Sequence, residues 1–321
     1  MRSVKLLFIL PIIFGAFGAA SAQQSLDQRM KLESARSDKF TGGTIEKTRL
    51  APGEADIKIT VNVPAFQMTL WQNGREVKTY WVGVGMKDYP IYIGERHASA
   101  VIWNPNWIPP NSEWVTGSKG ITPYEVIEPT DPRNPLGRLK IPLGDGFLLH
   151  QAKGAGDLGS LVSHGCVRVL LPDLYDLAEK ITAAHSLPVT AKEIAQAKAS
   201  KKNTVTAELD PSVPVEITYD TLVVEAGKLH IYPDVYERKT NTVEKLRAEL
   251  DSSGINTKKL SDGMLEKLLG KIADKKQYVV SVKDLESGKA LTNGKVMPVV
   301  LRGVTEAKPR NNATTVRRRR A

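Results

Sequence analysis

Two histidines and one cysteine lie close together in the sequence, in a pattern that could carry nucleophilic catalysis. Residues 163–168 read Ser-His-Gly-Cys-Val-Arg, and twelve residues separate this segment from His150. A cysteine attacks through its thiolate, and a nearby imidazole can take the thiol proton and stabilise the resulting charge. Cys166 is the one cysteine of the 321 residues, so a disulfide within the chain and a cysteine metal cluster are both excluded. We therefore interpret Cys166 as a nucleophile.

The two histidines differ in how they can reach this thiol. His150 ends a predicted buried strand over residues 146–150, and a base on a second rigid element can face both the nucleophile and the leaving group. We therefore expect His150 to be the general base. His164 stands two residues before Cys166 and is expected to orient the turn or line the site. Gly165 permits a sharp bend that turns main-chain N–H groups toward an oxyanion.

The other polar residues of the segment have supporting roles. Arg168 could grip a substrate carboxylate or shape the site through hydrogen bonds, and a loop-bracing arginine fits equally well. Ser163 is a further supporting side chain at the start of the segment. A zinc site built from the histidines and the cysteine is disfavoured, because a fourth ligand and an acidic partner are missing from the pattern. The sequence predicts no metal and no organic cofactor.

Strand patterns around the segment indicate the elements that position it. Apolar residues alternate over 57–63, and two strands over 68–84 are joined by the turn signal Asn73-Gly74. A helix is predicted over 172–181 with Pro172 at its start, followed by a closing strand over 188–190. Farther on, strands are predicted over 213–218, 222–224 and 228–233, and helices over 243–250 and 264–272. These patterns predict a β-rich α+β fold.

The first 22 residues are typical of a secretory signal peptide. Arg2 and Lys5 precede an apolar run over 6–20, and Ala20-Ser21-Ala22 is a cleavage site of small residues. An uncleaved anchor helix is less favoured, because the run is shorter than the ~20 residues of a membrane span. Cleavage removes two of the basic residues and lowers the net charge from +10 to +8. We expect an exported, soluble protein of the periplasm.

Shifts in composition divide the rest of the chain. We expect a linker over 23–55, a catalytic domain over 56–190, a linker over 191–210, a C-terminal extension over 211–307 and a disordered basic tail over 308–321. The four arginines of the tail and the positive net charge could attract anionic polymers or a membrane surface. Nucleic acid is not an expected partner, since the chain shows no recognised nucleic-acid module.

Together, His150 and residues 163–168 resemble the signature of the L,D-transpeptidase (YkuD-like) catalytic domain, and the resemblance covers about residues 56–190. It implies a β-sandwich-like catalytic domain, here followed by a smaller α/β extension. The segments Trp-Asn-Pro-Asn-Trp at 103–107 and Asn-Pro-Leu-Gly at 134–137 resemble the members found in Gram-negative envelopes. Residues 89–94 depart from the family, because they keep only the proline and glycine of its Thr-Pro-x-Gly turn.

The resemblance implies a reaction of peptidoglycan biosynthesis, and hence a part in cell-wall biogenesis and cell shape. Cys166 would attack the carbonyl of the third residue of a tetrapeptide stem, usually meso-diaminopimelate, and release D-alanine. His150 would be the proton donor and acceptor, and the backbone carbonyl of Gln151 would orient its ring. An amine would then take the acyl group, which gives a 3→3 cross-link or the attachment of an envelope protein.

Other activities fit parts of the pattern. An L,D-carboxypeptidase or an amidase of the same fold would pass the acyl group to water, and the sequence does not separate transfer from hydrolysis. A non-catalytic peptidoglycan-binding envelope protein would keep the fold without the chemistry, but Cys166 and His150 are both intact. A papain-like protease is disfavoured by residue order, because its cysteine precedes its histidine.

Overall fold

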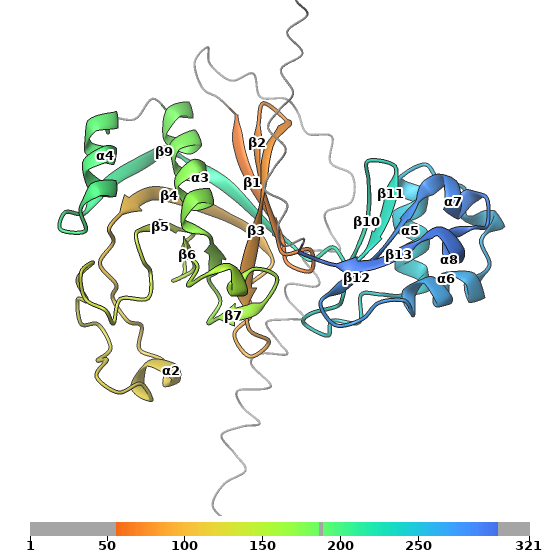
Figure 1. Cartoon of the computed structure of the whole chain (residues 1–321), viewed down its shortest axis with the longest axis horizontal. Coiled ribbons are helices and arrows are strands. Elements are labelled where there is room, and N and C mark those ends of the chain that lie inside the picture. The colour runs from red at the N-terminus through yellow and green to blue at the C-terminus, as the bar shows by residue number, and fades with distance from the viewer. Residues whose placement is uncertain (1–55, 186–188, 301–321) are drawn as a thin grey trace, which may run out of the picture. The chain divides into compact units, whose positions relative to one another are not determined.

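The computed structural model describes residues 56–185 and 189–300 (Figure 1). All of them belong to one compact unit, Leu50–Ala321. The predicted signal peptide, the N-terminal linker up to residue 55, Pro188 and the basic tail lie outside the described residues. Across the two described stretches, none of the helices has the length and apolar character that crossing a membrane requires.

A mixed sheet of nine strands forms the centre of the catalytic region. Strand β2 also pairs with β3, so the sheet closes on itself, and β7 extends it from β3. This architecture confirms the predicted β-rich α+β class. In spatial order the strands are β2 (Gln67–Gln72), β1 (Ile57–Asn62), β9 (Val205–Thr218), β4 (Gly94–Trp103), β5 (Leu139–Pro142), β6 (Leu148–Gln151), β8 (Val167–Val169), β3 (Arg75–Gly85) and β7 (Leu161–Ser163).

Local sequence signals explain the first strands of this sheet. Buried and partly buried residues alternate along β1, as a strand with one face in the core requires. β2 and β3 pair directly across Asn73-Gly74, and both turn residues have positive φ, 52° and 71°. Asn-Gly accepts this left-handed backbone, which matches the twist of the paired strands. The predicted hairpin is therefore confirmed.

Helix α3 (Leu171–Ala184) packs on β5 and β6 (Figure 1). Its buried side chains Leu174, Leu177 and Ile181 recur at helical spacing and join the main core, and the predicted helix with its early proline is confirmed. Residues 189–190, predicted as a strand, instead lead into helix α4 (Ala191–Ala199). The reason is a capping box, in which Thr190 and Glu193 each accept a hydrogen bond from the other's main-chain N–H.

The sheet continues well past residue 190, where the sequence pattern ended it. β9 pairs in parallel with β1, where Ile59 faces Val215, and antiparallel with β4. Residues 205–210, expected to be a linker, are therefore part of a central strand. The strand predicted over 213–218 is confirmed as the second part of β9, whereas the part before it was missed. Two prolines, Pro211 and Pro214, interrupt the strand pattern, and the β4–β9 ladder accommodates them near a register shift between Ala98 and Ala100.

The long connection between β4 and β5, residues 104–138, has a small core of its own. Trp107, Ile127 and Leu136 are buried together, and the short helix α2 (Glu113–Thr116) lies within the connection. Arg133 links its two sides through hydrogen bonds to Gly120 O and the Asp131 carboxylate. The connection is thus a folded part of the domain.

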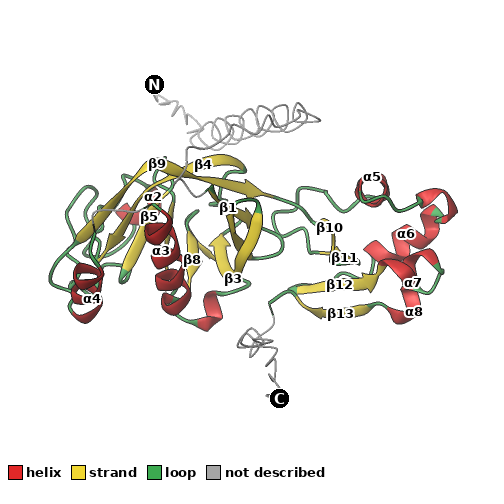
Figure 2. Ribbon diagram, turned by 90° about the horizontal axis from the view of Figure 1, so that it is seen from above, coloured by secondary structure: helices red, strands yellow, loops and turns green. Residues whose placement is uncertain are grey.

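The C-terminal extension forms a second sheet with its own hydrophobic core. Figure 2 shows short helices beside this small sheet, in agreement with the predicted α/β extension. The strands, in order, are β10 (Leu222–Glu225), β11 (Lys228–Ile231), β12 (Lys276–Ser281) and β13 (Lys295–Pro298). The helical elements are α5 (Val243–Ser252), the 3-10 turn η2 (Thr257–Lys259), α6 (Asp262–Leu269), α7 (Val282–Glu286) and α8 (Ala290–Asn293).

Candidate functional site

The pairing of β6 with β8 brings the predicted catalytic residues to one face of the sheet. The two strands are parallel, and His150 is the register partner of Arg168. Because alternate residues of a strand point to opposite faces, His150 and Arg168 share a face, and Cys166, two residues before Arg168, continues it. Leu149 and Val167 point the other way, into the main core. Cys166 directly precedes β8, so the thiol belongs to the segment beside β6, and strand alternation predicts that it faces the same side as the imidazole.

The connection 104–138 packs against this same face. Leu148 precedes His150 by two residues on β6, and its side chain contacts the small core around Trp107. The face that carries Cys166 and His150 is therefore bordered by a folded segment, which can restrict the access of water to a reacting group.

The turn before Cys166 is fixed by three contacts. The Ser163 hydroxyl donates to Cys166 O at 2.5 Å, and Ser163 O accepts a hydrogen bond from Met86 N at 2.9 Å. Gly165 has a φ of +106°, and a Cβ at this position would lie 2.7 Å from a ring carbon of Phe147. Glycine is therefore required here on both backbone and steric grounds. Ser163 thus holds the turn that precedes Cys166.

Cys166 is half-buried, and burial raises the pKa of its thiol. Two groups oppose this shift: a hydrogen bond from the Leu148 backbone and the positive charge of Arg168 both lower the pKa. Burial prevails, so the resting group is the neutral thiol at neutral pH. Attack on a carbonyl then requires a base that removes the proton during the reaction.

His150 is 4 % exposed, and burial lowers the pKa of its imidazole to about 4, with the charge of Arg168 acting in the same direction. The backbones of Gln151 and Leu136 and the carboxylate of Asp157 act weakly in the opposite direction. Nδ1 is buried without a hydrogen bond of proper geometry to any described residue. At neutral pH the ring is therefore uncharged and able to accept a proton.

Gln151 contributes through its side chain. Oε1 accepts a hydrogen bond from Arg138 N at 2.8 Å and contacts the backbone at Gly137, where φ is +73°. A Cβ at position 137 would also lie 2.7 Å from Gln151 Cβ, so the glycine is needed for this close approach. The side chain thus ties the end of the connection 104–138 to β6. The orientation of the His150 ring by the Gln151 carbonyl stays a prediction, because Nδ1 is unpartnered here.

Arg168 is paired with an acid that the sequence analysis did not single out. Its Nη1 lies 3.0 Å from Oδ2 of Asp157, and the two side chains are only 12 % and 15 % exposed. Asp157 ends the 3-10 turn η1 (Ala155–Asp157), which lies over β3 at Gly83; a Cβ there would be 2.5 Å from Asp157 O. Of the two roles considered for Arg168, this ion pair favours bracing of the site. Asp157 has no motif of its own, and only the folded chain brings it to Arg168.

His164 stands in a row of aromatic rings. It stacks on Trp114 with ring centroids 4.2 Å apart and meets the edge of Tyr89 at 4.6 Å, and Trp114 in turn stacks on Trp107 at 6.2 Å. Part of the His164 ring is exposed to solvent. The burial of the rest is the main cause that lowers the pKa of the imidazole, and the charge of Arg168 is the second. These ring contacts fix the position of His164 beside Tyr89 and Trp114, and its role in lining the site stays a prediction. Tyr89 and Trp114 are the partners that sequence reasoning missed, although their aromatic, loop-borne character was a usable signal.

Over residues 56–185 and 189–300, His, Cys, Asp and Glu side chains form no group of three that could hold a metal ion.

The buried, neutral His150 should make the fold sensitive to acid. Its imidazole titrates near 6.5 in the unfolded chain and about 4 in the folded one, so between these values the unfolded state binds the extra proton and gains stability as the pH falls. Lowering the pH from 7 to 4.5 should therefore remove roughly 2–3 kcal/mol of unfolding free energy through this group. Urea unfolding at both pH values measures the loss, and His150→Gln should lose less by that amount. Equal losses in both proteins would contradict the shifted pKa.

Comparison with known proteins places the site in a family context. The family model for YkuD, the L,D-transpeptidase catalytic domain, matches residues 56–217, which includes β1 to nearly the end of β9. A protein of Escherichia coli K12 described as "Probable L,D-transpeptidase YbiS" is 27 % identical over 149 residues, which cover 44 % of this chain and 47 % of that protein. The chain thus spans about half the length of the curated relatives it matches.

Solved structures give further similarities. An L,D-transpeptidase from Mycobacterium smegmatis is 15 % identical to this chain, with a TM-score of 0.30. The match covers 51 % of this chain and 59 % of the M. smegmatis chain. The catalytic domain of an E. faecium L,D-transpeptidase, solved by NMR in a form acylated by ertapenem, is 16 % identical to this chain, with a TM-score of 0.32. The match covers 51 % of this chain and 97 % of the E. faecium chain.

Proposed function

Because this chain belongs to the family of L,D-transpeptidase catalytic domains, we propose that it is a peptidoglycan L,D-transpeptidase with Cys166 as nucleophile and His150 as general base. The observation that supports the proposal is the pairing of β6 with β8, which holds His150 beside the segment that begins directly after Cys166. The neutral states of both groups fit a mechanism in which the proton moves during attack.

The first half of the reaction forms an acyl-enzyme. His150 takes the thiol proton while the Cys166 sulfur attacks the carbonyl carbon of the third stem residue, diaminopimelate. The carbonyl oxygen becomes an oxyanion, which main-chain N–H groups of the turn at Gly165 stabilise. The C–N bond to D-alanine then breaks, and the departing amine takes the proton from His150. Each loss of D-alanine leaves one thioester on Cys166.

The second half of the reaction resolves the thioester. An acceptor amine attacks the same carbonyl, His150 takes a proton from this amine, and the sulfur leaves and is reprotonated. The acceptor is the side-chain amine of a second stem peptide, which gives a 3→3 cross-link, or a lysine of an envelope protein. The aromatic row from Trp107 to Tyr89 and the connection 104–138 restrict the access of water to the thioester. This favours attack by the acceptor amine over hydrolysis.

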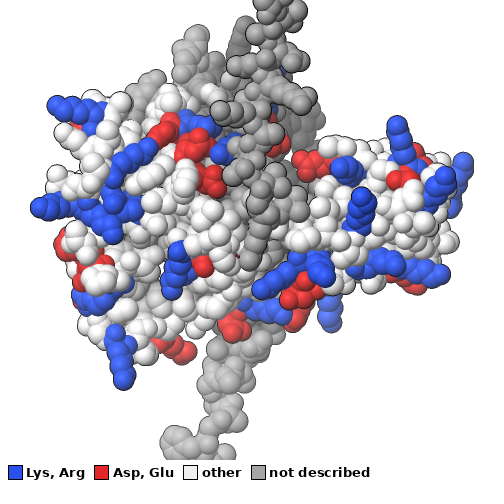
Figure 3. Space-filling view, in the orientation of Figure 1, with Lys and Arg blue, Asp and Glu red and all other residues white. Residues whose placement is uncertain are grey.

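This function has a place and a set of partners. The predicted signal peptide supports a periplasmic location, where peptidoglycan stem peptides would be the substrate. On the face shown in Figure 3, Lys and Arg side chains are interspersed with Asp and Glu. Such a surface offers weak, general attraction to anionic envelope polymers, whereas the basic tail over 308–321 would be a stronger contact.

Mass spectrometry of the purified protein with a disaccharide-tetrapeptide tests the proposal. Loss of D-alanine together with a cross-linked dimer supports transpeptidation. Loss of D-alanine with tripeptide as the sole product would instead indicate a carboxypeptidase, or a transferase whose acceptor is a protein absent from the assay. An unchanged tetrapeptide with unmodified Cys166 would overturn the proposal and favour an amidase or a non-catalytic binding protein.

A further inference from the structure

Tyr236 lies beyond the family match at 56–217, yet its side chain reaches the catalytic region. Its phenol donates a hydrogen bond to the main-chain oxygen of Gly85 at 2.9 Å. Gly85 is the last residue of β3, next to the turn that carries Cys166. We propose that Tyr236 is a positioning residue, which holds the turn at 163–166 and thereby sets the environment of the thiol. This inference rests on the proposed function, in which the thiol is the nucleophile, but the reactivity of the thiol can be measured without that function.

Gly85 links the hydrogen bond of Tyr236 to the turn that carries Cys166. This residue pairs with Ser163 of β7, and a Cβ built on it would lie 3.0 Å from Cα of Gly165. The next residue, Met86, donates its N–H to Ser163 O. The backbone at 85–86 is therefore packed directly against the turn, and a shift there has to move Gly165 or Ser163 because close-packed interiors leave no free space.

The segment that bears Tyr236 is itself well braced. The Tyr219 hydroxyl donates to Asp234 Oδ1 at 2.6 Å and accepts from Tyr236 N at 2.6 Å. The rings of Tyr219 and Tyr236 stack with centroids 5.5 Å apart. Asp234 also accepts from the main-chain N–H groups of Arg238 and Thr240, at 2.9 and 3.1 Å. The phenol of Tyr236 is thus presented by a preorganised loop, which lowers the entropy cost of its contact.

Two further contacts support a fixed docking of this segment. Lys87, two residues after Gly85, forms an ion pair with Glu237. Val300 packs so closely on Gly159 that a Cβ there would lie 2.7 Å from its side chain. Burial raises the pKa of Tyr236 to about 12, so the phenol stays protonated and remains a donor over the whole working range of pH.

Loss of the phenol should act on the thiol indirectly. Without it, Gly85 O is unpartnered and the turn at 163–166 can relax. The Leu148 backbone and the charge of Arg168 lower the pKa of Cys166, and both effects depend on where the turn holds the sulfur. Burial, the largest influence on this pKa, depends on the same position. Displacement of the sulfur therefore shifts its pKa and slows acylation, while substrate binding elsewhere is retained.

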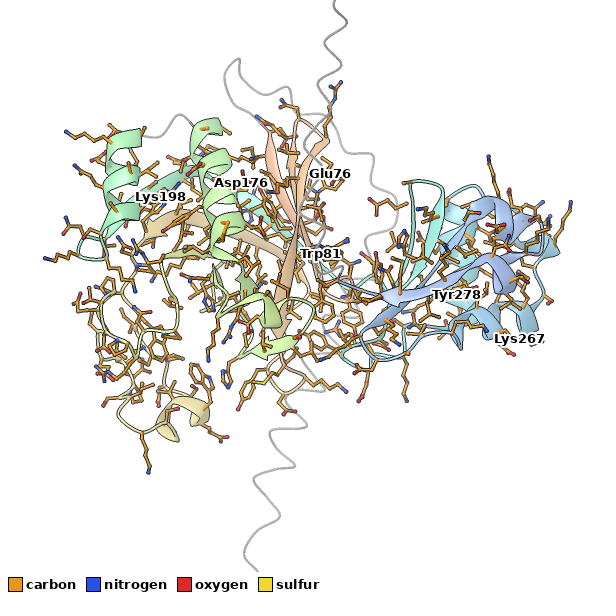
Figure 4. All side chains as sticks on the ribbon, in the orientation of Figure 1. Glu76, Trp81, Asp176, Lys198, Lys267 and Tyr278 are labelled. Carbon is orange, nitrogen blue, oxygen red and sulfur yellow. The ribbon has the colours of Figure 1, made fainter. Side chains whose placement is uncertain are left out.

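The test compares Tyr236→Phe with the matched variant Tyr278→Phe in the full protein. Tyr278 also bonds a backbone carbonyl, that of Ala290, but it lies on β12 of the C-terminal sheet (Figure 4). Cys166 is the one cysteine, so the rate of iodoacetamide alkylation, followed by mass spectrometry across pH, reports on this thiol alone. Thermal unfolding shows that each variant is folded. Tyr219→Phe, which loosens the loop without touching Gly85, provides a second variant.

We expect Tyr236→Phe to shift the midpoint of the alkylation profile by about half a pH unit or more and to lower kcat for the tetrapeptide about tenfold or more with KM nearly unchanged. Tyr219→Phe should shift the midpoint in the same direction by less, and Tyr278→Phe should match the wild type. A wild-type midpoint in Tyr236→Phe, or equal shifts in Tyr236→Phe and Tyr278→Phe, would overturn the inference. If the wild type does not turn over the tetrapeptide but the midpoint still shifts, the proposed function fails and the positioning role stands.

Discussion

Replacement of Cys166 by alanine is expected to abolish both the release of D-alanine and the acyl-enzyme adduct. The sulfur is the atom that forms the thioester, and no other cysteine exists in the chain to replace it. Turnover should fall by about a thousandfold or more, to the background of the assay. Intact-protein mass spectrometry after incubation with tetrapeptide detects the adduct, and chromatography of the muropeptides measures D-alanine release.

The same variant should fold normally, because alanine fits the space of a half-buried cysteine whose sulfur accepts one backbone hydrogen bond. Urea unfolding within about 1 kcal/mol of the wild type would show this. Under these conditions a lost activity is a chemical loss. An adduct that still forms in Cys166→Ala, or maps to another residue, would show that the nucleophile lies elsewhere.

Replacement of His150 by alanine or glutamine should lower turnover by about a hundredfold to ten-thousandfold. The imidazole has a pKa of about 4 and the thiol a raised one, so the wild type depends on His150 to take the proton during attack. The wild-type rate should be flat above about pH 5 and fall below it, as the ring becomes protonated. In both variants this acid limb should vanish, and the remaining rate should rise with pH as the thiolate fraction grows.

His164→Ala is the matched control for the base. It removes an exposed imidazole close to Cys166 in the sequence, together with its ring contacts to Trp114 and Tyr89. We expect a smaller effect, mainly on KM, and an unchanged acid limb. A larger loss of kcat in His164→Ala than in His150→Ala would reverse the assignment of the general base.

Much of the fold could be predicted because its signals are local. Asn73-Gly74 specifies a two-residue hairpin by its backbone preferences alone, and Pro172 with Leu174 and Leu177 specifies a helix start and its buried face. The short segment around Cys166 was recognisable for the same reason. Strand β4 gave no such signal, since Glu95, Arg96 and His97 interrupt its apolar pattern.

The remaining features depend on residues that meet only after folding. Asp157 reaches Arg168 because Gly83 lets the turn η1 lie over β3, and no pattern in 154–159 announces this. Tyr236 reaches Gly85 from another part of the chain through a loop organised by Asp234. Such contacts are set by the geometry of the whole sheet, which hydrophobic periodicity does not encode.

The position of β9 has a consequence for how the protein can assemble. This strand is inserted between β1 and β4, and it pairs Val215 with Ile59 from the other end of the domain. During synthesis the nine-stranded sheet cannot close until residue 218 is available. Until then β1 and β4 expose unpaired backbone groups that other chains can bind. A fragment that stops at residue 190 would leave the β9-facing edges of β1 and β4 permanently unpaired and would tend to aggregate. Any shortened version intended to fold must therefore extend through Thr218.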